Sequence, residues 1–553
     1  MKQMLSKRLF LVFAITGIFL AGAFTGRYFL AEEITADDAR SAAKIAGLDF
    51  TQAEIDSLLP ELNDFRKSYI ANREEKIPNA LSPALVFNPL PPGFFMPQKQ
   101  EKVVFSDPGK VKMPKNKDDL AFFTVRELAE LIRTKQISSV ELTRFFIDRL
   151  KKYDEKLHCV VTLTEALALE QAKRADAEIA KGQYRGLLHG IPYGAKDLLA
   201  TKNYKTTWGA MPYKDQMLNY DATVITKLEE AGAVLVAKLT LGALAMGDVW
   251  FGGMTRNPWD IETGSSGSSA GSASAVSAGL LPFAIGTETL GSIVSPSTVC
   301  GTTGLRPTFG RVSKFGAMAL SWSMDKIGPI TRSVEDCAIV FNAIYGPDGN
   351  DMSLIQAPFN YNAKFNTKKL KVGYLKSAFE RNYAFKTQDS IALAKMRELG
   401  YELIPIELPE VPSIRFILSA EAAAAFDELT LSNRDDLLVR QGKNAWPNTF
   451  RQARFIPAVE YIQANRLRSQ LIAEMAKVFE QVDVYLNPSW GNSSLLATNL
   501  TGHPCVVMPN GFRDNGRPTS ITFTGKLFGE AELLSLAKAW QDATDYHKKH
   551  PEL

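Results

Sequence analysis

The sequence has few cysteines and few histidines for its length of 553 residues. The four cysteines show no CxxC spacing and no pattern of a disulfide framework, so we predict that they are small core residues. They are Cys159, Cys300, Cys337 and Cys505. Histidine is the usual base beside a serine nucleophile, and only five histidines are present, two of them in the charged C-terminal tail.

The sequence also lacks a run of basic residues. Its 64 Lys and Arg residues are interspersed with 60 Asp and Glu residues, which gives a net charge of +4. Nucleic-acid-binding proteins concentrate basic residues on one surface, so we expect no nucleic-acid partner. Apolar residues make up 45% of the chain and charged residues 22%. These shares are typical of a soluble globular protein, and the length allows one large domain with appendages.

One long apolar run is present, at the N-terminus. Lys2, Lys7 and Arg8 precede an uncharged stretch over residues 9–26, which contains small residues around Gly22. This layout is typical of a secretory signal, although its length also reaches the lower limit of a membrane-spanning helix. We therefore predict a signal peptide or an N-terminal membrane anchor over residues 1–31. Either one predicts an exported protein, periplasmic, secreted or anchored with its main domain outside the cytoplasm.

Two further segments precede the main domain. Residues 32–76 predict a helical arm with two helices, the second of which begins at the capping box Thr51–Glu54. Residues 77–117 contain eight prolines, which exclude helix and most central strand. We expect this segment to be extended and to lie over the surface of the main domain.

The main domain, residues 118–553, alternates helices with short apolar runs. It begins with capping boxes at Thr124 and Ser138. Strands are predicted over residues 159–163, 190–195, 233–239, 281–287 and 371–374. Such alternation is typical of an α/β domain with a mostly parallel sheet. Residues 412–477 are mainly helical and contain interleaved aromatic residues. They predict a cap over the sheet edge, or else ordinary helices whose aromatic residues face the core.

The stretch GSSGSSAGSASAVSAG, residues 264–279, has the composition of a flexible linker. An apolar helical run and a strand follow it directly, so we predict instead a tight loop that enters a helix of small residues. The next strand returns to the same sheet edge. Ser268 and the loop 287–292 are therefore expected to meet there, together with Lys196 at the end of another strand. Ligands bind at such carboxyl edges.

Lys196 has two interpretations on the residues alone. A desolvated position would lower the pKa of its amine and allow it to act as the base for a serine. Alternatively, Lys196 forms a surface ion pair with its neighbour Asp197.

Two short motifs point to other chemistry. Residues 267–271 match GxSxG, with Ser269 as the nucleophile, but a polar segment containing Pro258 precedes them where a strand is required. Ser323 and Lys326 match SxxK without its partner motifs. We interpret both as chance matches. The glycines lack the lysine of a phosphate-binding loop, so phosphate binding is not expected.

Longer segments resemble the amidase signature family. Residues 266–307 resemble its signature block, and GIPYGAKD at 190–197 resembles its lysine motif. Further agreement runs through residues 307–316 and 325–338 and extends to the C-terminal region. The resemblance covers about residues 118–553. It implies a single large α/β domain with a mixed sheet of about eleven strands flanked by α-helices, to which the helical arm is added.

The resemblance also implies a Ser-Ser-Lys triad. Ser292 would be the nucleophile, and Ser268, after a cis peptide bond, would connect it to Lys196. The oxyanion hole would consist of the backbone N–H groups of Thr289, Leu290, Gly291 and Ser292. The implied reaction is hydrolysis of a linear carboxylic amide, a small-molecule substrate, through an acyl-enzyme, with release of ammonia or an amine. It uses no metal and no organic cofactor.

Four positions depart from the family pattern. Ser266 and Ala270 replace glycines, Leu290 stands where Gly or Asp is common, and Val294 replaces an arginine. The last two favour uncharged substrates. Three alternatives stay open: an amidotransferase A-type subunit that releases ammonia from glutamine, a Ser-His-Asp esterase that uses Ser269 and His503, and an inactive binding protein on the same fold.

Overall fold

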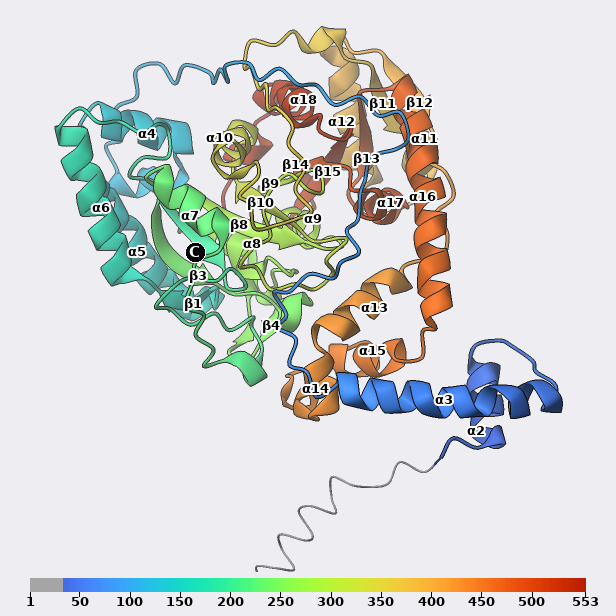
Figure 1. Ribbon diagram of the computed structural model, residues 1–553. Coiled ribbons are helices and arrows are strands. Elements are labelled where there is room, and N and C mark those ends of the chain that lie inside the picture. Colours follow the sequence, from blue (N-terminus) through green and yellow to red (C-terminus); the bar gives the residue numbers. More distant parts are fainter. Residues whose placement is uncertain (1–32) are drawn as a thin grey trace, which may run out of the picture. The chain divides into compact units, whose positions relative to one another are not determined.

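The structure is a computed structural model that describes residues 33–553 (Figure 1). The chain divides into two compact units, Met1–Pro78 and Asn79–Leu553. The predicted signal peptide or anchor over residues 1–31 lies outside the described residues. Among the helices that the structure describes, none combines the length and the apolar character that crossing a bilayer requires.

The first unit contains the two helices predicted for the arm, α2 (Ala36–Ile45) and α3 (Gln52–Asn72). Each begins with a capping box, at Thr35 and Thr51. There the threonine hydroxyl accepts the third helical N–H, and the acidic side chain at that third position accepts the N–H of the cap. The expected capping box of the second helix is therefore confirmed.

The second unit is built on one sheet of eleven strands. They are β1 (Val160–Leu163), β2 (Pro192–Lys196), β3 (Val234–Leu239), β8 (Phe283–Glu288), β9 (Thr303–Arg306), β10 (Lys326–Thr331), β11 (Val372–Leu375), β12 (Leu403–Ile406), β13 (Val484–Pro488), β14 (Cys505–Phe512) and β15 (Pro518–Gly525). Their order across the sheet is β1-β3-β2-β8-β10-β9-β14-β15-β13-β11-β12. The five strands predicted from the sequence are β1, β2, β3, β8 and β11, each within two residues of the expected ends.

The sheet is mixed, so the prediction of a mostly parallel sheet is wrong and the mixed sheet that the family resemblance implies is confirmed. Strands β3, β2 and β8 are parallel neighbours, as are β13, β11 and β12, whereas the other six of the ten neighbouring pairs are antiparallel. Strand–helix alternation holds in the parallel parts only. β14 and β15 form a hairpin instead, and the prolines Pro509 and Pro518 within them concealed both strands in the sequence.

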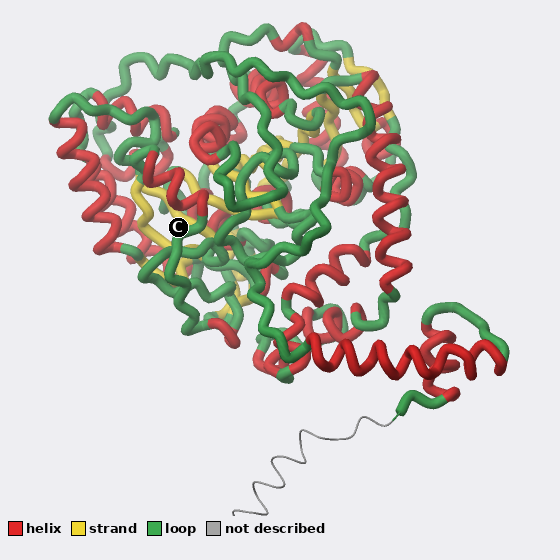
Figure 2. The backbone as a smooth tube through the Cα atoms, viewed as in Figure 1, coloured by secondary structure: helices red, strands yellow, loops and turns green. Residues whose placement is uncertain are grey.

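Helices flank the sheet (Figures 1 and 2). They are α4 (Val125–Arg133), α5 (Ser139–Leu157), α6 (Glu165–Ala180), α7 (Thr223–Glu230), α8 (Ala270–Ser277), α9 (Val294–Cys300), α10 (Val334–Ile344), α11 (Lys376–Glu380), α12 (Lys386–Glu398), α17 (Ser494–Thr501) and α18 (Glu530–Asp542). The capping boxes predicted at Thr124 and Ser138 begin α4 and α5. Helix α8 packs on β8 and helix α9 on β14, which places the starts of both helices beside the middle of the sheet.

The region 412–477 is mainly helical, as predicted. It contains α13 (Phe416–Ala425), α14 (Asp427–Leu431), α15 (Trp446–Ala453) and most of α16 (Ala458–Gln481). The aromatic rings of Phe426 and Trp446 stack on Phe450 and are buried, and the indole N–H of Trp446 donates to the carbonyl oxygen of Leu244 (2.9 Å). These aromatic residues therefore belong to the core of the second unit.

The proline-rich segment before Lys117 contains no helix in the part that the structure describes, as expected. Figure 2 shows it as a long loop, in green. Val104 forms an isolated parallel bridge with Asn362, and Phe87 packs edge-on against Phe309, with ring centroids 5.0 Å apart. From Asn79 onward the segment is part of the second unit.

Candidate active site

Lys196 stands at the carboxyl end of β2, next to the parallel strand β8. Its Nζ donates hydrogen bonds to the hydroxyls of Ser268 (2.8 Å), Ser269 (3.1 Å) and Thr287 (2.8 Å). Ser268 and Ser269 come from the loop before α8, and Thr287 comes from β8. The convergence predicted from the topology is therefore present for Lys196, Ser268 and the start of the loop 287–292.

The side chain of Lys196 is fully buried. Burial lowers the pKa of its amine to about 7, although the carboxylates of Asp325 and Glu288 act in the opposite direction. The alternative ion pair with Asp197 is wrong, because successive side chains of a strand point to opposite faces. Asp197 pairs instead with the buried Lys238, with 2.9 Å between the carboxylate and Nζ.

The loop before α8 brings its backbone very close to another loop. The Gly267–Ser268 peptide bond is cis, as the family resemblance implies. A Cβ at Gly267 would lie 1.9 Å from the carbonyl oxygen of Gly247, so only glycine fits there. Ser266 has a φ of 59°, a conformation that favours glycine, and its N–H donates to the carboxylate of Asp248 (2.9 Å). That hydrogen bond stabilises a serine where the family commonly has glycine.

Ser292 belongs to the loop between β8 and α9. Its carbonyl oxygen accepts the N–H of Ser269 (3.1 Å), so its backbone lies directly beside the loop that carries Ser268. Within the described part of the chain, the Ser292 hydroxyl forms no hydrogen bond with Ser268 or Lys196. The three side chains are thus joined as a bonded Lys196–Ser268 pair and a neighbouring Ser292.

The loop that carries Ser292 presents unused hydrogen-bond donors. Among residues 33–553, the backbone N–H groups of Thr289, Leu290, Gly291 and Ser292 donate to no carbonyl oxygen and to no side chain. Gly291 has a φ of 88°, which turns the loop just before the serine. Backbone donors without a protein acceptor are what an oxyanion hole requires.

A buried carboxylate holds this loop from behind. Glu288 accepts the N–H groups of Ile293 (2.9 Å) and Val294 (3.0 Å) and pairs with the guanidinium of Arg306 (2.7 Å). Burial by itself would raise the pKa of Glu288, but Arg306 and these hydrogen bonds hold it at about 2. Glu288 is therefore ionised and fixes the start of α9 directly after Ser292. The sequence signal for this pair is a charged residue in each of two otherwise uncharged strands.

Asp325 connects the same loop to a neighbouring wall. One of its carboxylate oxygens accepts the Thr289 hydroxyl, and the other accepts the N–H groups of Leu320 (2.8 Å) and Ser321 (3.0 Å). Burial raises the pKa of Asp325, and these hydrogen bonds act against that effect. Asp325 and Thr287 were not among the site residues expected from the sequence.

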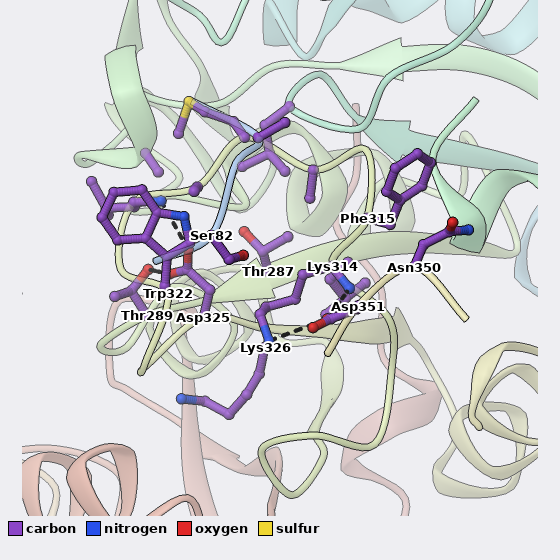
Figure 3. A pocket seen from close by; sticks show the side chains of 18 residues that line it. Ser82, Thr287, Thr289, Lys314, Phe315, Trp322, Asp325, Lys326, Asn350 and Asp351 are labelled. Carbon is purple, nitrogen blue, oxygen red and sulfur yellow. Dashed lines mark hydrogen bonds and ion pairs between the residues drawn. The ribbon is translucent and has the colours of Figure 1, made fainter. Parts of the chain in front are cut away.

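A pocket with about 650 Å³ of empty space, part of it open to solvent, lies next to the loop of Thr287 and Thr289. Its apolar lining includes Leu198, Ala317, Met318, Leu320, Trp322 and Ile327. Figure 3 shows Trp322 and Asp325 on one side and Phe315, Asn350 and Asp351 on the other. None of the residues lining this pocket falls within 412–477, so the expectation that those helices line the substrate pocket is wrong here. Glu421 of α13 instead contacts Ser321 and Ser323 of the pocket wall segment.

The two short motifs do not assemble. The Ser269 hydroxyl donates to the carbonyl oxygen of Thr287 (3.0 Å), whereas the ring of His503 bonds the Thr501 hydroxyl (2.8 Å) and stacks on Phe479. Burial lowers the pKa of His503 to about 3. The residues proposed for a Ser-His-Asp esterase therefore lie in separate hydrogen-bond groups.

The SxxK match is likewise structural. The Ser323 hydroxyl donates to Glu421 (2.7 Å), and Nζ of Lys326 donates to the carbonyl oxygen of Met324. This serine and lysine form no hydrogen bond with each other.

Comparison with known proteins identifies the family. A family model described as Amidase matches residues 141–534. The chain belongs to the amidase signature family. This amidase is also 35% identical over 481 residues to the A-type subunit of a glutamyl-tRNA(Gln) amidotransferase from Coxiella burnetii, with 78% of this chain and 99% of the relative covered.

Solved structures agree with the family and the fold. An amidase family protein from Bacillus anthracis matches with a TM-score of 0.71 and 28% identity, covering 79% of this chain and 93% of that one. A peptide amidase from Stenotrophomonas maltophilia matches with a TM-score of 0.68 and 28% identity, covering 79% and 99%. The fold is thus the amidase signature fold, with one large domain around a mixed eleven-stranded sheet, and the chain is an enzyme of this family.

Proposed function

We propose that this amidase hydrolyses linear carboxylic amides of small molecules through Ser292, Ser268 and Lys196. The observation that supports this most directly is the state of Lys196. Its amine is fully buried, has a pKa of about 7 and lies 2.8 Å from the hydroxyl of Ser268. A lysine in that state is neutral in a large share of molecules at neutral pH and can accept a proton.

In the proposed reaction, neutral Lys196 takes a proton from Ser268 while Ser268 takes one from Ser292. The Ser292 oxygen bonds to the amide carbon, and the N–H groups of residues 289–292 stabilise the oxyanion. When the carbon–nitrogen bond breaks, the proton returns from Lys196 through Ser268 to the leaving amine. Water then attacks the acyl-enzyme by the same relay and releases the carboxylic acid.

The pH dependence of kcat/KM tests the role of Lys196. The active form is the neutral amine, so activity is lost when Lys196 becomes protonated. Because the pKa of Lys196 is about 7, we expect kcat/KM to fall about tenfold per pH unit below that value and to level off above it. The measurement is a kcat/KM profile on a neutral amide. A profile that stays flat from pH 5 to pH 8, about two units on the acid side, would contradict a neutral lysine base.

The second candidate is an amidotransferase A-type subunit that generates ammonia from glutamine, and the similarity to the Coxiella burnetii protein favours it. Glutamine carries an ammonium and a carboxylate, which need unpaired charges in the site. In the pocket, Lys314 and Asp351 pair with each other at 3.3 Å, and Asp325 already accepts three hydrogen bonds. These contacts support an uncharged substrate group, as Leu290 and Val294 do.

A panel of neutral amides and glutamine, assayed with the isolated chain and with Ser292→Ala, separates the two candidates. The hydrolase predicts turnover of neutral amides without partner subunits, whereas the amidotransferase predicts turnover of glutamine. Labelling of Ser292 by a fluorophosphonate separates both from an inactive binding protein.

The place of action is part of the proposal. The charged start and apolar run of residues 1–31 support export, with cleavage of a signal peptide or retention of a membrane anchor. N-terminal sequencing of the protein from separated cell fractions tests it. Recovery of the uncleaved chain from the soluble cytoplasmic fraction would contradict export.

A further inference from the structure

A short segment that precedes the family domain lines the pocket. Ala80 and Ser82 are among the lining residues, whereas the family match begins at residue 141. In Figure 3, Ser82 lies near Trp322 and Thr287, which line the same pocket. The entrance of the pocket is thus made partly by residues outside the matched domain.

The side chain of Asn79 fixes this segment. Its amide oxygen accepts the N–H of Ala319 (2.8 Å), and its amide nitrogen donates to the carbonyl oxygens of Ala319 (2.9 Å) and Ala425 (3.2 Å). Ala319 itself lines the pocket, and Ala425 is the last residue of α13. Asn79 therefore joins the segment to the pocket wall in the manner of a paired strand.

Residues further along hold the other end of the segment. The guanidinium of the buried Arg468 lies 3.5 Å from the ring centroid of Phe87, which also contacts Phe309. Pro83 restricts the backbone between these two attachments. Ala80 and Ser82 are exposed to solvent, but the backbone that carries them is attached on both sides.

We propose that residues 79–82 determine the size of substrate that this amidase accepts. The inference rests on the proposed amide hydrolysis. Ala80 and Ser82 have small side chains and stand opposite apolar residues such as Met318 and Trp322, so the pocket admits an uncharged group that reaches its mouth. Asn79 is a positioning residue that keeps this wall in place. Each methylene gained or lost in such a pocket changes discrimination about tenfold or more.

Ser82→Trp tests the wall directly. We measure kcat/KM for two series of amides, one with lengthening acyl chains and one with lengthening amines. The ratio of the longest to the shortest substrate should fall at least about tenfold in one series. Leu85→Trp is the matched control. It places the same side chain in the same segment, at a residue that is 79% exposed and does not line the pocket, and its ratios should equal those of the wild type.

Asn79→Ala tests positioning. Loss of its hydrogen bonds should raise KM for the long substrates about fivefold or more relative to the short ones, with a smaller change in kcat. A residue that only stabilises the fold would lower the active fraction, and so change kcat equally for all substrates. Asn79→Asp keeps an acceptor for Ala319 but loses the donor, and it should give an intermediate shift.

The outcomes separate this inference from the proposed function. If the wild type hydrolyses no amide in either series, the proposed function is overturned. If the wild type is active and the size profiles of Ser82→Trp and Asn79→Ala match its own in both series, amide hydrolysis stands and the role of residues 79–82 is overturned.

Discussion

Ser292→Ala is expected to lower kcat for amide hydrolysis by about 10⁴- to 10⁶-fold, because removing a nucleophile leaves only the contribution of binding and the oxyanion donors. The fold should be retained, since the Ser292 hydroxyl bonds neither Ser268 nor Lys196 within the described residues. The measurement is kcat on a neutral amide, together with labelling by a fluorophosphonate, which the variant should not show.

Two serines nearby provide controls for this result. Ser295, three residues further along in α9 and partly exposed, should tolerate alanine with activity close to that of the wild type. Ser269→Ala should leave a nucleophile in place and reduce activity far less than Ser292→Ala does. If Ser269→Ala and His503→Ala abolish turnover and Ser292→Ala does not, the esterase alternative is correct.

Lys196→Met is expected to lower kcat/KM by about 10²- to 10⁴-fold, the usual contribution of a positioned base. Methionine fits a buried position of this length without a charge. The acid limb of the pH profile near 7 should disappear, since the group that titrates there, with a pKa of about 7, is gone. The measurement is the pH profile of the variant, with circular dichroism to show that it is folded.

Lys196→Arg sharpens the test of a neutral base. A guanidinium stays protonated throughout the accessible pH range, so this variant should be as inactive as Lys196→Met, although it keeps a cation. Lys205→Met, at an exposed lysine that pairs with Asp215, is the matched control and should keep full activity. Substantial activity of Lys196→Arg would indicate that the charge of the lysine, and not proton transfer, is what the site uses.

The sequence predicted the parts of the site that depend on local order along the chain. The capping boxes at Thr124 and Ser138 begin helices because the two partners of each box are only three residues apart. Lys196 and the loop of Ser268 were placed at one edge because strand, helix and strand follow each other there. The mixed sheet came from the family resemblance. The roles of Lys196, Ser268 and Ser292 remain predictions that the variants above test.

Tertiary structure decided the contacts between residues that are far apart in the sequence. The partner of Lys196 is Ser268, 72 residues away, and not the adjacent Asp197. Glu288 pairs with Arg306 across the sheet, and Asn79 bonds Ala319 across 240 residues. A local pattern carries no information on such pairs, because burial and strand pairing choose them. The same packing removes water from the amine of Lys196 and so sets its pKa near 7.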